Sequence, residues 1–551
     1  MNKLKYIFAF SAGLLLSSCY EDKGDYDYDN TIIEVPVTLQ QSYGVKKAKE
    51  KFSYTITPDI HVPKEYEKNL SYEWYVKTES DAYIKGELKG TDKNFTLEID
   101  PTDPKMAYNY YIRLYVTDAT TGAVTMRPTT LEVIKPYTYA WMVLHETDGH
   151  AELGAVEYMG GEIAVTPDAY TRDKGESLSG KPLNLSCTQF KFYDYYYRLE
   201  AQSPLFLTTT DETESGLIDQ TDNFRLRNSW DMLLNAAQKE EAFDPTNIIY
   251  SGGNQGAIMT CKGKVFSHSQ YTPVMYLMSQ GNNLIGDYYI SKLVCGPQAG
   301  VGFDEIGKRF VDISCQNYDS KSYSHVVPST PCDMGPIIPI PNNEGNALNV
   351  DPNNLPKDQK IVALVNGYHY GKSGIAPWQR YTIYAYTLNG SSQSFVYVFQ
   401  CRGLTGNDPA LPYYYTFVTP DGIDENTPMT SGNSFNNILF YAAGNKIYKL
   451  DVPTGKTTLI YQHEDPAATV ADLRMACEGY SFSDQSDEIG IKDYGVPYNR
   501  CLGAAFNLSD GTGELVVLQL NTNGRLLEEQ TKYPSTQVHR GFGKIKNIVF
   551  I

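Results

Sequence analysis

The chain has 551 residues, which is enough for roughly two to four domains. It carries 47 Lys and Arg against 65 Asp and Glu, and the formal net charge of −18 excludes a general nucleic-acid binder, because an acidic surface repels phosphates. Hydrophobic residues make up 41% of the chain, which excludes a bundle of membrane spans and a disordered chain. There are 45 Tyr against 21 Phe and 4 Trp, and this excess of a strand-forming aromatic with a polar hydroxyl predicts β-structure.

Residues 1–18 have the features of a lipoprotein signal peptide. Two lysines precede an apolar run over 6–16, which is too short to span a bilayer and has the length of a signal-peptide core. The run ends in Leu-Ser-Ser followed by Cys19, and this end resembles a bacterial lipobox. The resemblance implies cleavage before Cys19 and acylation of Cys19, so that several acyl chains anchor the protein in a membrane. An ordinary secretory signal and a buried structural Cys are the alternatives.

Residues 19–30 predict a solvated tether. They hold five acidic residues and one basic residue, with too little aliphatic content to fold. Asp25, Asp27 and Asp29 imitate the start of a calcium-binding loop. The twelfth position of that loop would be Pro36, where a bidentate Glu is needed, so a calcium site is rejected.

The residues around Cys19 also carry a family resemblance. Residues 18–28, Ser-Cys-Tyr-Glu-Asp-Lys-Gly-Asp-Tyr-Asp-Tyr, resemble the mature start of the PKD-like family lipoproteins of Bacteroidota. The acidic run is similar to the signal that sends lipoproteins of that phylum to the outer face of the outer membrane. The resemblance implies a gene beside SusC/SusD-like importers and a role in capturing glycans or peptides at the cell surface.

Residues 31–136 predict a small immunoglobulin-like or PKD-like β-sandwich, with strands rich in Tyr, Val, Ile and Thr over 52–57, 71–77, 94–99, 110–117 and 125–134. Trp74 stands where such a sandwich keeps a buried aromatic side chain. The Trp-Asp-Phe-Gly-Asp-Gly segment of typical PKD domains is missing, and no Cys occurs between Cys19 and Cys187. The expected domain is therefore a PKD-like variant without an inter-sheet disulfide.

Residues 137–551 predict a β-propeller, because short strands alternate with turns over 141–145, 205–210, 247–252, 257–265, 361–368, 381–388, 395–401, 437–451 and 457–461. Gly444-Asn445 is the expected turn of the clearest hairpin. At ~45–60 residues per blade we expect seven blades. Residues 544–551 are expected to pair with the strand near Trp141 and to close the ring.

Two stretches depart from the repeated pattern of strands. Residues 229–242 predict a helix that is inserted into one blade. Residues 328–356 hold seven prolines and predict an irregular excursion, which is either functional or a packed structural loop.

The sequence contains no recognisable catalytic or metal-binding motif. His145 and His150 are five residues apart instead of the four that a zinc helix requires, and no Gly-x-Ser-x-Gly elbow occurs. Eight cysteines besides Cys19 include no Cys-x-x-Cys pair, so disulfides and buried thiols stay open as alternatives. We therefore expect no catalytic residue, metal or cofactor, although distant carboxylates could converge on a propeller axis.

Aromatic clusters are the best candidates for ligand contact. Flat rings beside Arg or Gln stack on sugar faces or grip peptide side chains, whereas packing between blades is the alternative for each ring. The candidate ligand-binding residues are Tyr193, Tyr195, Tyr197, Trp378, Arg380 and Tyr414.

Together these patterns predict an all-β, lipid-anchored protein of the outer membrane, exposed at the cell surface. It would act as a non-catalytic ligand-binding or accessory subunit of an outer-membrane glycan or peptide uptake system, with a SusC/SusD-like importer as partner and no nucleic-acid partner. The alternatives are a propeller-fold glycan hydrolase or lyase and a protein-interaction scaffold.

Overall fold

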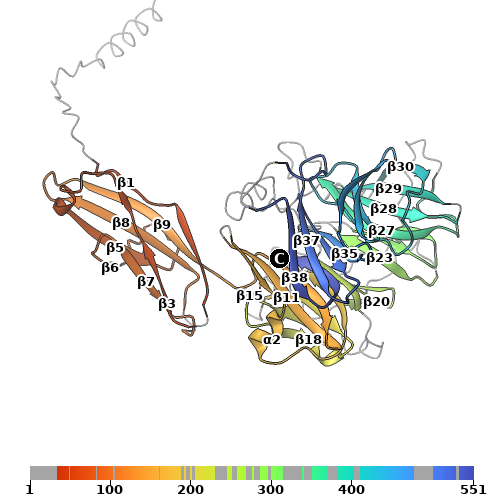
Figure 1. Ribbon diagram of the computed structural model, residues 1–551, viewed down its shortest axis with the longest axis horizontal. Helices are drawn as coiled ribbons and strands as arrows, with labels where there is room; N and C mark the ends of the chain where they lie inside the picture. The colour runs from red at the N-terminus through yellow and green to blue at the C-terminus, as the bar shows by residue number, and fades with distance from the viewer. Residues whose placement is uncertain are drawn as a thin grey trace, which may run out of the picture. The chain divides into compact units, whose positions relative to one another are not determined.

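The structure is a computed structural model that describes residues 34–48, 50–81, 83–103, 106–159, 162–187, 192–193, 199–201, 205–229, 245–250, 257–267, 276–277, 286–295, 300–313, 338–339, 350–369, 381–390, 392–401, 410–476, 500–528 and 533–551. The chain divides into two compact units, Met1–Pro136 (unit 1) and Tyr137–Ile551 (unit 2). The predicted all-β class is confirmed, with 57% strand and 4% helix (Figure 1). Among the described residues, no helix has the length and apolar character that crossing a bilayer requires.

Unit 1 is built from nine strands within its described residues: β1 (Val37–Thr38), β2 (Ser42–Lys46), β3 (Phe52–Ile56), β4 (Asp59–Ile60), β5 (Leu70–Lys77), β6 (Glu87–Gly90), β7 (Phe95–Ile99), β8 (Asn109–Asp118) and β9 (Val124–Ile134). A five-stranded sheet has the order β2-β9-β8-β5-β6, in which β2 and β9 run parallel, while β3 pairs with β7 and β1 with β4. A short 3₁₀ turn, η1 (Glu67–Asn69), precedes β5.

The core of unit 1 forms around Trp74, as predicted. Alternation along β5 and β8 turns Trp74, Ile112 and Leu114 inward, and each is at most 1% exposed. The Trp74 indole stacks on Phe95 at 5.3 Å between ring centroids, and its Nε1 donates a hydrogen bond to the carbonyl of Asp92 at 2.8 Å. The buried indole therefore has a polar partner, which removes the usual cost of burying its N–H.

Unit 2 contains seven four-stranded antiparallel sheets among its described residues. The first three sheets are β12 (Glu162–Thr166), β11 (His150–Met159), β10 (Ala140–Thr147), β39 (Lys544–Phe550); β13 (Pro182–Cys187), β16 (Leu205–Thr209), β17 (Gly216–Asp219), β18 (Arg225–Ser229); and β19 (Pro245–Tyr250), β20 (Ala257–Cys261), β21 (Lys264–Ser267), β22 (Tyr276–Leu277). The next two are β23 (Ile290–Cys295), β24 (Gly300–Asp304), β25 (Arg309–Asp312), β26 (Ile338–Pro339); and β27 (Lys360–His369), β28 (Tyr381–Leu388), β29 (Gln393–Cys401), β30 (Ala410–Val418). The last two are β31 (Met429–Thr430), β32 (Ile438–Ala443), β33 (Lys446–Asp451), β34 (Thr457–Gln462); and β35 (Thr469–Met475), β36 (Cys501–Asn507), β37 (Gly513–Gln519), β38 (Thr536–Phe542).

Smaller elements complete the described part of unit 2. They are a two-stranded sheet of β14 (Phe192–Tyr193) and β15 (Leu199–Ala201), the helix α2 (Ala169–Lys174) and the 3₁₀ turn η2 (Glu212–Glu214). The sequence reasoning missed α2. This helix is short and ends at Gly175, whose positive φ of 82° makes it a left-handed C-cap.

One terminal strand of each four-stranded sheet contacts the corresponding strand of the next sheet. These strands are β13, β19, β23, β27, β31 and β35, which contact one another in that order. The strand β39 contacts both β35 and β13, so the series of contacts returns to its start. We call these seven strands the inner strands.

The predicted pairing of the C-terminal strand with the strand near Trp141 is confirmed. β39 pairs antiparallel with β10, with Trp141 opposite Phe550 and Val143 opposite Ile548. The strand that ends the chain thus completes the sheet that begins unit 2. The buried Trp141 ring meets Phe550 nearly edge-on, with 5.4 Å between the ring centroids.

Polar side chains of the last sheet bind the backbone of β39. Asn507 accepts a hydrogen bond from the Ile545 N–H at 2.7 Å and donates one to the Ile545 carbonyl at 3.0 Å. Asp472 accepts the N–H of Ile548 at 3.1 Å. Backbone groups of β39 that do not pair with β10 therefore find hydrogen-bond partners in the seventh sheet, as an edge strand requires.

Turn chemistry explains two of the hairpins. The predicted turn at Gly444-Asn445 joins β32 to β33, with Gly444 at a φ of 58° at the first loop position. Residues 257–265, predicted as one strand, instead form β20 and β21 around Lys262 and Gly263. Both have positive φ, 47° and 74°, which suits a two-residue turn that reverses the chain.

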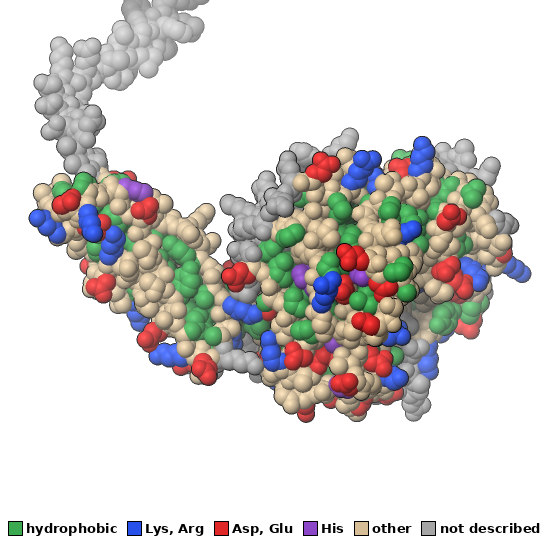
Figure 2. All heavy atoms as spheres, viewed as in Figure 1, with side chains coloured by type: hydrophobic (Ala, Val, Ile, Leu, Met, Phe, Trp, Pro, Cys, Tyr) green, Lys and Arg blue, Asp and Glu red, His purple; other side chains and the backbone are tan. Residues whose placement is uncertain are grey.

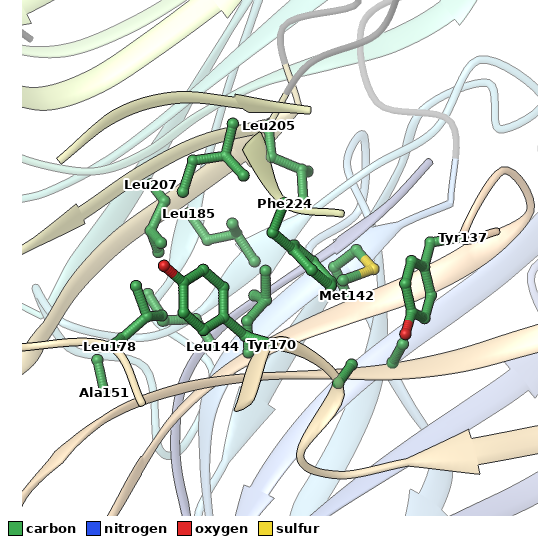
Figure 3. Packing of buried hydrophobic residues seen from close by; sticks show 14 of the residues in the cluster. Tyr137, Met142, Leu144, Ala151, Tyr170, Leu178, Leu185, Leu205, Leu207 and Phe224 are labelled. Atoms are coloured by element: carbon green, nitrogen blue, oxygen red, sulfur yellow. The ribbon is translucent and has the colours of Figure 1, made fainter. Parts of the chain in front are cut away.

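Apolar packing joins the first two sheets of unit 2 (Figure 3). Met142 and Leu144 from β10 meet Leu185 from β13 and Leu205 and Leu207 from β16. Each of these side chains is at most 2% exposed. The inward faces of adjacent sheets therefore share one core, so neither sheet buries its apolar face without the other.

The two predicted departures from the strand pattern have different outcomes. The helix predicted over 229–242 lies outside the described residues, except for its first residue, which ends β18. The irregular excursion predicted over 328–356 includes β26 at Ile338–Pro339, which pairs with β25 as the edge strand of the fourth sheet. An edge position tolerates Pro339 because the missing N–H has no ladder partner to serve.

Deleting residues 544–551 should unfold unit 2. The deletion removes Ile545 and Ile548, both at most 2% exposed, and losing such a side chain costs about 2–5 kcal/mol each. That sum is comparable to the total stability of ~5–15 kcal/mol of most proteins. Calorimetry of the truncated protein should show loss of the main transition, and an unchanged melting temperature would contradict closure by β39.

A point variant separates strand closure from general truncation damage. Asn507→Ala should lower the free energy of unfolding by about 1–3 kcal/mol, because two backbone groups of Ile545 lose their partner. Asn426→Ala, at an exposed loop position of the same unit, is the matched control and should leave stability nearly unchanged.

Candidate functional site

Most of the predicted ligand-binding residues lie outside the part of the chain that the structure describes. This holds for Tyr195, Tyr197, Trp378 and Arg380, and also for the lipid-attachment candidate Cys19. The backbone of Tyr193 lies in the two-residue strand β14. The ligand contacts predicted for these residues therefore stay predictions.

Tyr414 is the predicted ligand residue whose surroundings are described. It lies on β30, half-buried, with its ring stacked on Phe395 at 6.1 Å and tilted against Tyr397 at 5.0 Å. Its ring packs against the apolar core between the fourth and fifth sheets. The described contacts of Tyr414 are packing contacts, and the ligand contact predicted for it stays a prediction.

A polar cluster on the inner strands is the strongest candidate site. Arg474 of β35 donates from Nε to both carboxylate oxygens of Asp472, at 3.1 and 3.2 Å. Asp472 Oδ2 also accepts from Asn547 Nδ2 on β39 at 3.4 Å. The cluster therefore joins the first and seventh sheets, and its guanidinium is held in a fixed orientation by the carboxylate.

Lys292 adds a second cation from the fourth sheet. It lies on β23 with an exposed side chain, and no described residue gives it a hydrogen bond or an ion pair. Desolvation by the surrounding protein lowers the pKa of Lys292, and the charge of Arg474 lowers it further, while Glu305 opposes both effects.

The electrostatic interaction of Lys292 with Arg474 reports on the geometry of unit 2. Their strands, β23 and β35, belong to the fourth and seventh sheets, which are not neighbours in the series of contacts between inner strands. Both residues therefore belong to inner strands, and the charge of Arg474 acts on Lys292 across unit 2. We call Lys292, Asp472, Arg474 and Asn547 the central cluster.

The central cluster has an acceptor without a partner. The Oδ1 atom of Asn547 is buried and meets no hydrogen-bond donor among the described residues. A buried acceptor left unpaired costs about 1–3 kcal/mol, so a ligand donor or an ordered water is the expected partner. The cluster thus combines the cations of Lys292 and Arg474 with one buried acceptor that no described residue uses.

Sequence reasoning missed the central cluster, although a signal was present. Lys292 stands in the run Ile-Ser-Lys-Leu-Val, and Arg474 stands in Val-Ala-Asp-Leu-Arg-Met. A charge within an apolar strand is unusual enough to mark each residue as a candidate. Nothing in either run says that the two strands lie around one centre.

A second polar cluster joins the sixth and seventh sheets. His463 lies 3.0 Å from Glu514, and Arg540 Nε donates to the other Glu514 oxygen at 2.7 Å. Burial alone would raise the pKa of Glu514, but the hydrogen bonds from His463 and Arg540 lower it. His463 also stacks on Phe506 at 4.8 Å, so the hydrogen bonds and the ring packing together join these two sheets.

Unit 1 carries a tyrosine face that the strand alternation could have identified. Tyr75 of β5 and Tyr115 of β8 meet edge-on at 5.6 Å on the outer side of the five-stranded sheet. Lys85 Nζ lies 3.7 Å from the Tyr75 ring centroid and 4.6 Å from that of Tyr115. The two rings thus already hold a cation of the chain, and this contact anchors the segment that leads to β6.

The surface in view carries no single charged patch on unit 2. Figure 2 shows acidic and basic side chains interspersed over that face, with hydrophobic side chains scattered between them. A mixed surface of this kind gives little electrostatic steering on that face.

Among the described residues, no group of three or more His, Cys, Asp or Glu side chains is placed to hold a metal ion. His145, which the sequence offered as half of a zinc pair, is buried, with Nε2 2.9 Å from the Pro167 carbonyl. Its Nδ1 accepts the Gly543 N–H at 3.0 Å. Both ring nitrogens therefore serve the packing of the first sheet.

Comparison with known proteins identifies one domain. The model of the PKD-like family matches residues 19–182, so the PKD-like resemblance is confirmed for this stretch. The match covers unit 1 beyond residue 18 and continues through β10, β11, β12 and α2 of unit 2. No curated protein matches the chain.

Several solved structures are similar at low level. Dihydro-heme d1 dehydrogenase NirN has 10% identity and a TM-score of 0.31, covering 79% of this chain and 71% of that one. A variant of Synechocystis apocarotenoid oxygenase has 8% identity and a TM-score of 0.26, covering 90% and 97%. A prolyl endopeptidase has 11% identity and a TM-score of 0.23, covering 75% and 46%. At such TM-scores these similarities carry no argument about activity.

Acid should destabilise unit 2 through His539. Burial lowers the pKa of His539 to about 4, whereas an unfolded His has a pKa of ~6.5. Between these values the unfolded chain binds a proton that the folded chain does not, so the free energy of unfolding falls as pH drops from 6.5 to 4. The loss should approach about 3 kcal/mol at pH 4, measured by urea unfolding.

Two variants check the assignment to His539. His539→Gln should flatten the pH dependence over this range. Some pH dependence of the same sign should remain, because burial also lowers the pKa of His145. Asn426→Ala, at an exposed loop position whose side chain does not titrate, should retain the full pH dependence. An unaltered slope in His539→Gln would refute the assignment.

Proposed function

We propose that the protein is a cell-surface lipoprotein and a non-catalytic ligand-binding or accessory subunit of an outer-membrane uptake system for glycans or peptides. Unit 2 would be a seven-bladed β-propeller, with each four-stranded sheet as one blade and β39 closing the ring. The circular series of contacts between inner strands supports this architecture. The pairing of β39 with β10 supports the closure.

One observation carries the binding role. The central cluster gathers Lys292, Arg474 and the unpaired Asn547 acceptor on inner strands that surround one centre. Propellers are arranged around a central channel, and a binding site needs a few convergent polar groups in an enclosed position. The ion pair of Asp472 with Arg474 engages that carboxylate, which favours binding over acid–base catalysis.

The proposed lipid anchor depends on one residue, Cys19. The lipobox-like sequence before Cys19 and the acidic run after it support export and anchoring. The PKD-like domain at residues 19–182 begins at this Cys. Anchoring through several acyl chains is stable.

Cys19→Ala should move the protein from the membrane fraction to the soluble fraction. Fractionation of cells that express the full chain, followed by immunoblotting, measures the change. Cys187→Ala is the matched control, because it removes a thiol from a position far along the chain, and it should stay membrane-associated. Unchanged membrane association of Cys19→Ala would rule out the lipoprotein assignment.

Binding to a glycan and peptide array should give at least one ligand class above background for the mature protein. Immobilised unit 1 and the full mature chain can be compared on the same array, and we expect binding to require unit 2. Co-purification of the tagged full chain in mild detergent should also recover a TonB-dependent barrel. Absence of both array binding and such a barrel would overturn the proposed function.

A further inference from the structure

We propose that β30 (Ala410–Val418) is an interaction surface for a second copy of this chain, and that the two β30 strands pair antiparallel across a two-fold axis at Thr416. The fifth sheets of the two copies would then form one continuous sheet. This inference is independent of the proposed function, because it uses neither the lipid anchor nor the central cluster. Failure of either one therefore leaves the other standing.

β30 is the free edge of the fifth sheet (Figure 1). Among the described residues, only the strand β29 pairs with it. The N–H of Thr419, just beyond β30, donates to the carbonyl of Ser392 at 2.9 Å. Because hydrogen-bonded positions alternate along an antiparallel pair, Tyr413, Tyr415 and Phe417 also bond to β29. The backbone groups of the residues between them therefore point away from the sheet.

The outward-facing backbone groups belong to Tyr414, Thr416 and Val418. No backbone hydrogen bond within the described part of the chain uses them. Apolar side chains beside them are open to solvent, since Tyr413 is 49% exposed and Val418 is 82% exposed. A row of unpaired donors and acceptors next to exposed apolar side chains is complementary to the backbone of another strand.

β30 also differs from the other outer strands, by which we mean the terminal strand of each four-stranded sheet opposite its inner strand. It has nine residues, whereas β22 and β26 have two each. Charged residues occur in β12, β18 and β38, and β34 has six residues with a register shift in its pairing. Short strands and charges protect an edge from pairing. Because β30 has neither, its edge is the outer edge best suited to another strand.

The residues of β30 are complementary to those of a second β30. A two-fold axis at Thr416 places this residue opposite its own copy and places Tyr414 opposite Val418, so the outward-facing backbone groups meet one another. The same register places Tyr415 opposite Phe417. Thr–Thr, aromatic–β-branched and aromatic–aromatic pairs are the kinds that stabilise antiparallel strands. The strand therefore suits a copy of itself along the whole of the proposed pair.

Two prolines delimit this pairing symmetrically. Pro412 and Pro420 each lie four residues from Thr416, so each would lie opposite the other one of the second copy. Both occupy outward-facing positions, where the missing N–H breaks no bond within the sheet. No charged residue occurs between them, although the whole chain has a formal net charge of −18. Two acidic copies can therefore meet at this strand without bringing like charges together.

Sedimentation velocity of the mature full chain tests the inference. We expect a concentration-dependent equilibrium of monomer and dimer in the micromolar range, since a short strand pair buries less surface than a permanent interface. Raising the salt concentration should strengthen the dimer or leave it unchanged, because salt screens the repulsion between the two acidic copies. A dimer that salt dissociates would depend on ion pairs elsewhere and would overturn the inference.

Thr416→Pro removes the N–H at the two-fold axis and should weaken dimerisation about tenfold or more. The fold should stay intact, since no described residue accepts this N–H and Pro412 already occupies an equivalent position of the strand. Thr416→Ala is the matched control, because it keeps the N–H, and it should change the dissociation constant less than Thr416→Pro does. Equal dimerisation of the unaltered chain and Thr416→Pro would contradict the proposed pair.

Cross-linking gives a readout that does not depend on the proline variant. In the proposed pair the two Cα atoms at position 416 lie about 5.5 Å apart, which a disulfide can span. Thr416→Cys should therefore form a disulfide-linked dimer under mild oxidation, as non-reducing electrophoresis and mass spectrometry of the linked peptides would measure. Thr458→Cys, at an exposed position of the uncharged outer strand β34, is the matched control and should form much less of it.

The remaining outcomes decide between a second copy and another occupant of this edge. A monomer at every concentration, without a cross-link at position 416, overturns the inference. Cross-linking of Thr458→Cys that is as efficient as that of Thr416→Cys places the contact elsewhere and also overturns it. A chain that stays monomeric, while its Thr416→Cys variant cross-links to a different protein in cells, assigns the edge to another partner and overturns the assignment to a second copy.

Discussion

The pairing of β39 with β10 is the constraint on which the rest of unit 2 depends. Trp141 lies opposite Phe550 in this pair, and the last strand of the chain thereby enters the first sheet of the unit. Without it, β10 would be an unpaired edge strand, which is costly and promotes aggregation. The inner strands contact one another from sheet to sheet. The pairing of β39 with β10 therefore supports the placement of all seven sheets.

The strand β39 also contributes to the candidate site. Asp472 accepts the Ile548 N–H of β39 and, with the same carboxylate, orients Arg474. A carboxylate that binds the closing strand therefore also positions a guanidinium. This dual role has a physical reason, since a buried carboxylate must satisfy several acceptor positions, and here backbone, amide and guanidinium donors share them. Stability and recognition are consequently coupled through one side chain.

Sequence patterns predicted the strands well where strand alternation or a turn residue determines the structure. Alternation over residues 110–117 turned Ile112 and Leu114 inward as expected, and Gly444 supplied the left-handed turn between β32 and β33. The prediction failed for residues 257–265, where Lys262 adopts a positive φ that its sequence does not require. It also missed α2, because a helix of this length has too few residues for a periodic signal.

The sequence by itself determined the all-β class, the buried Trp74 and the pairing of the final strand with the strand of Trp141, because each follows from residue type, alternation or an unpaired edge. Only the tertiary structure decided that Asp472 of β35 meets Asn547 of β39, and that Tyr414 packs against Tyr397. The reason is that alternation fixes which side of its own strand a residue occupies. It carries no information on how distant sheets are arranged around a common centre.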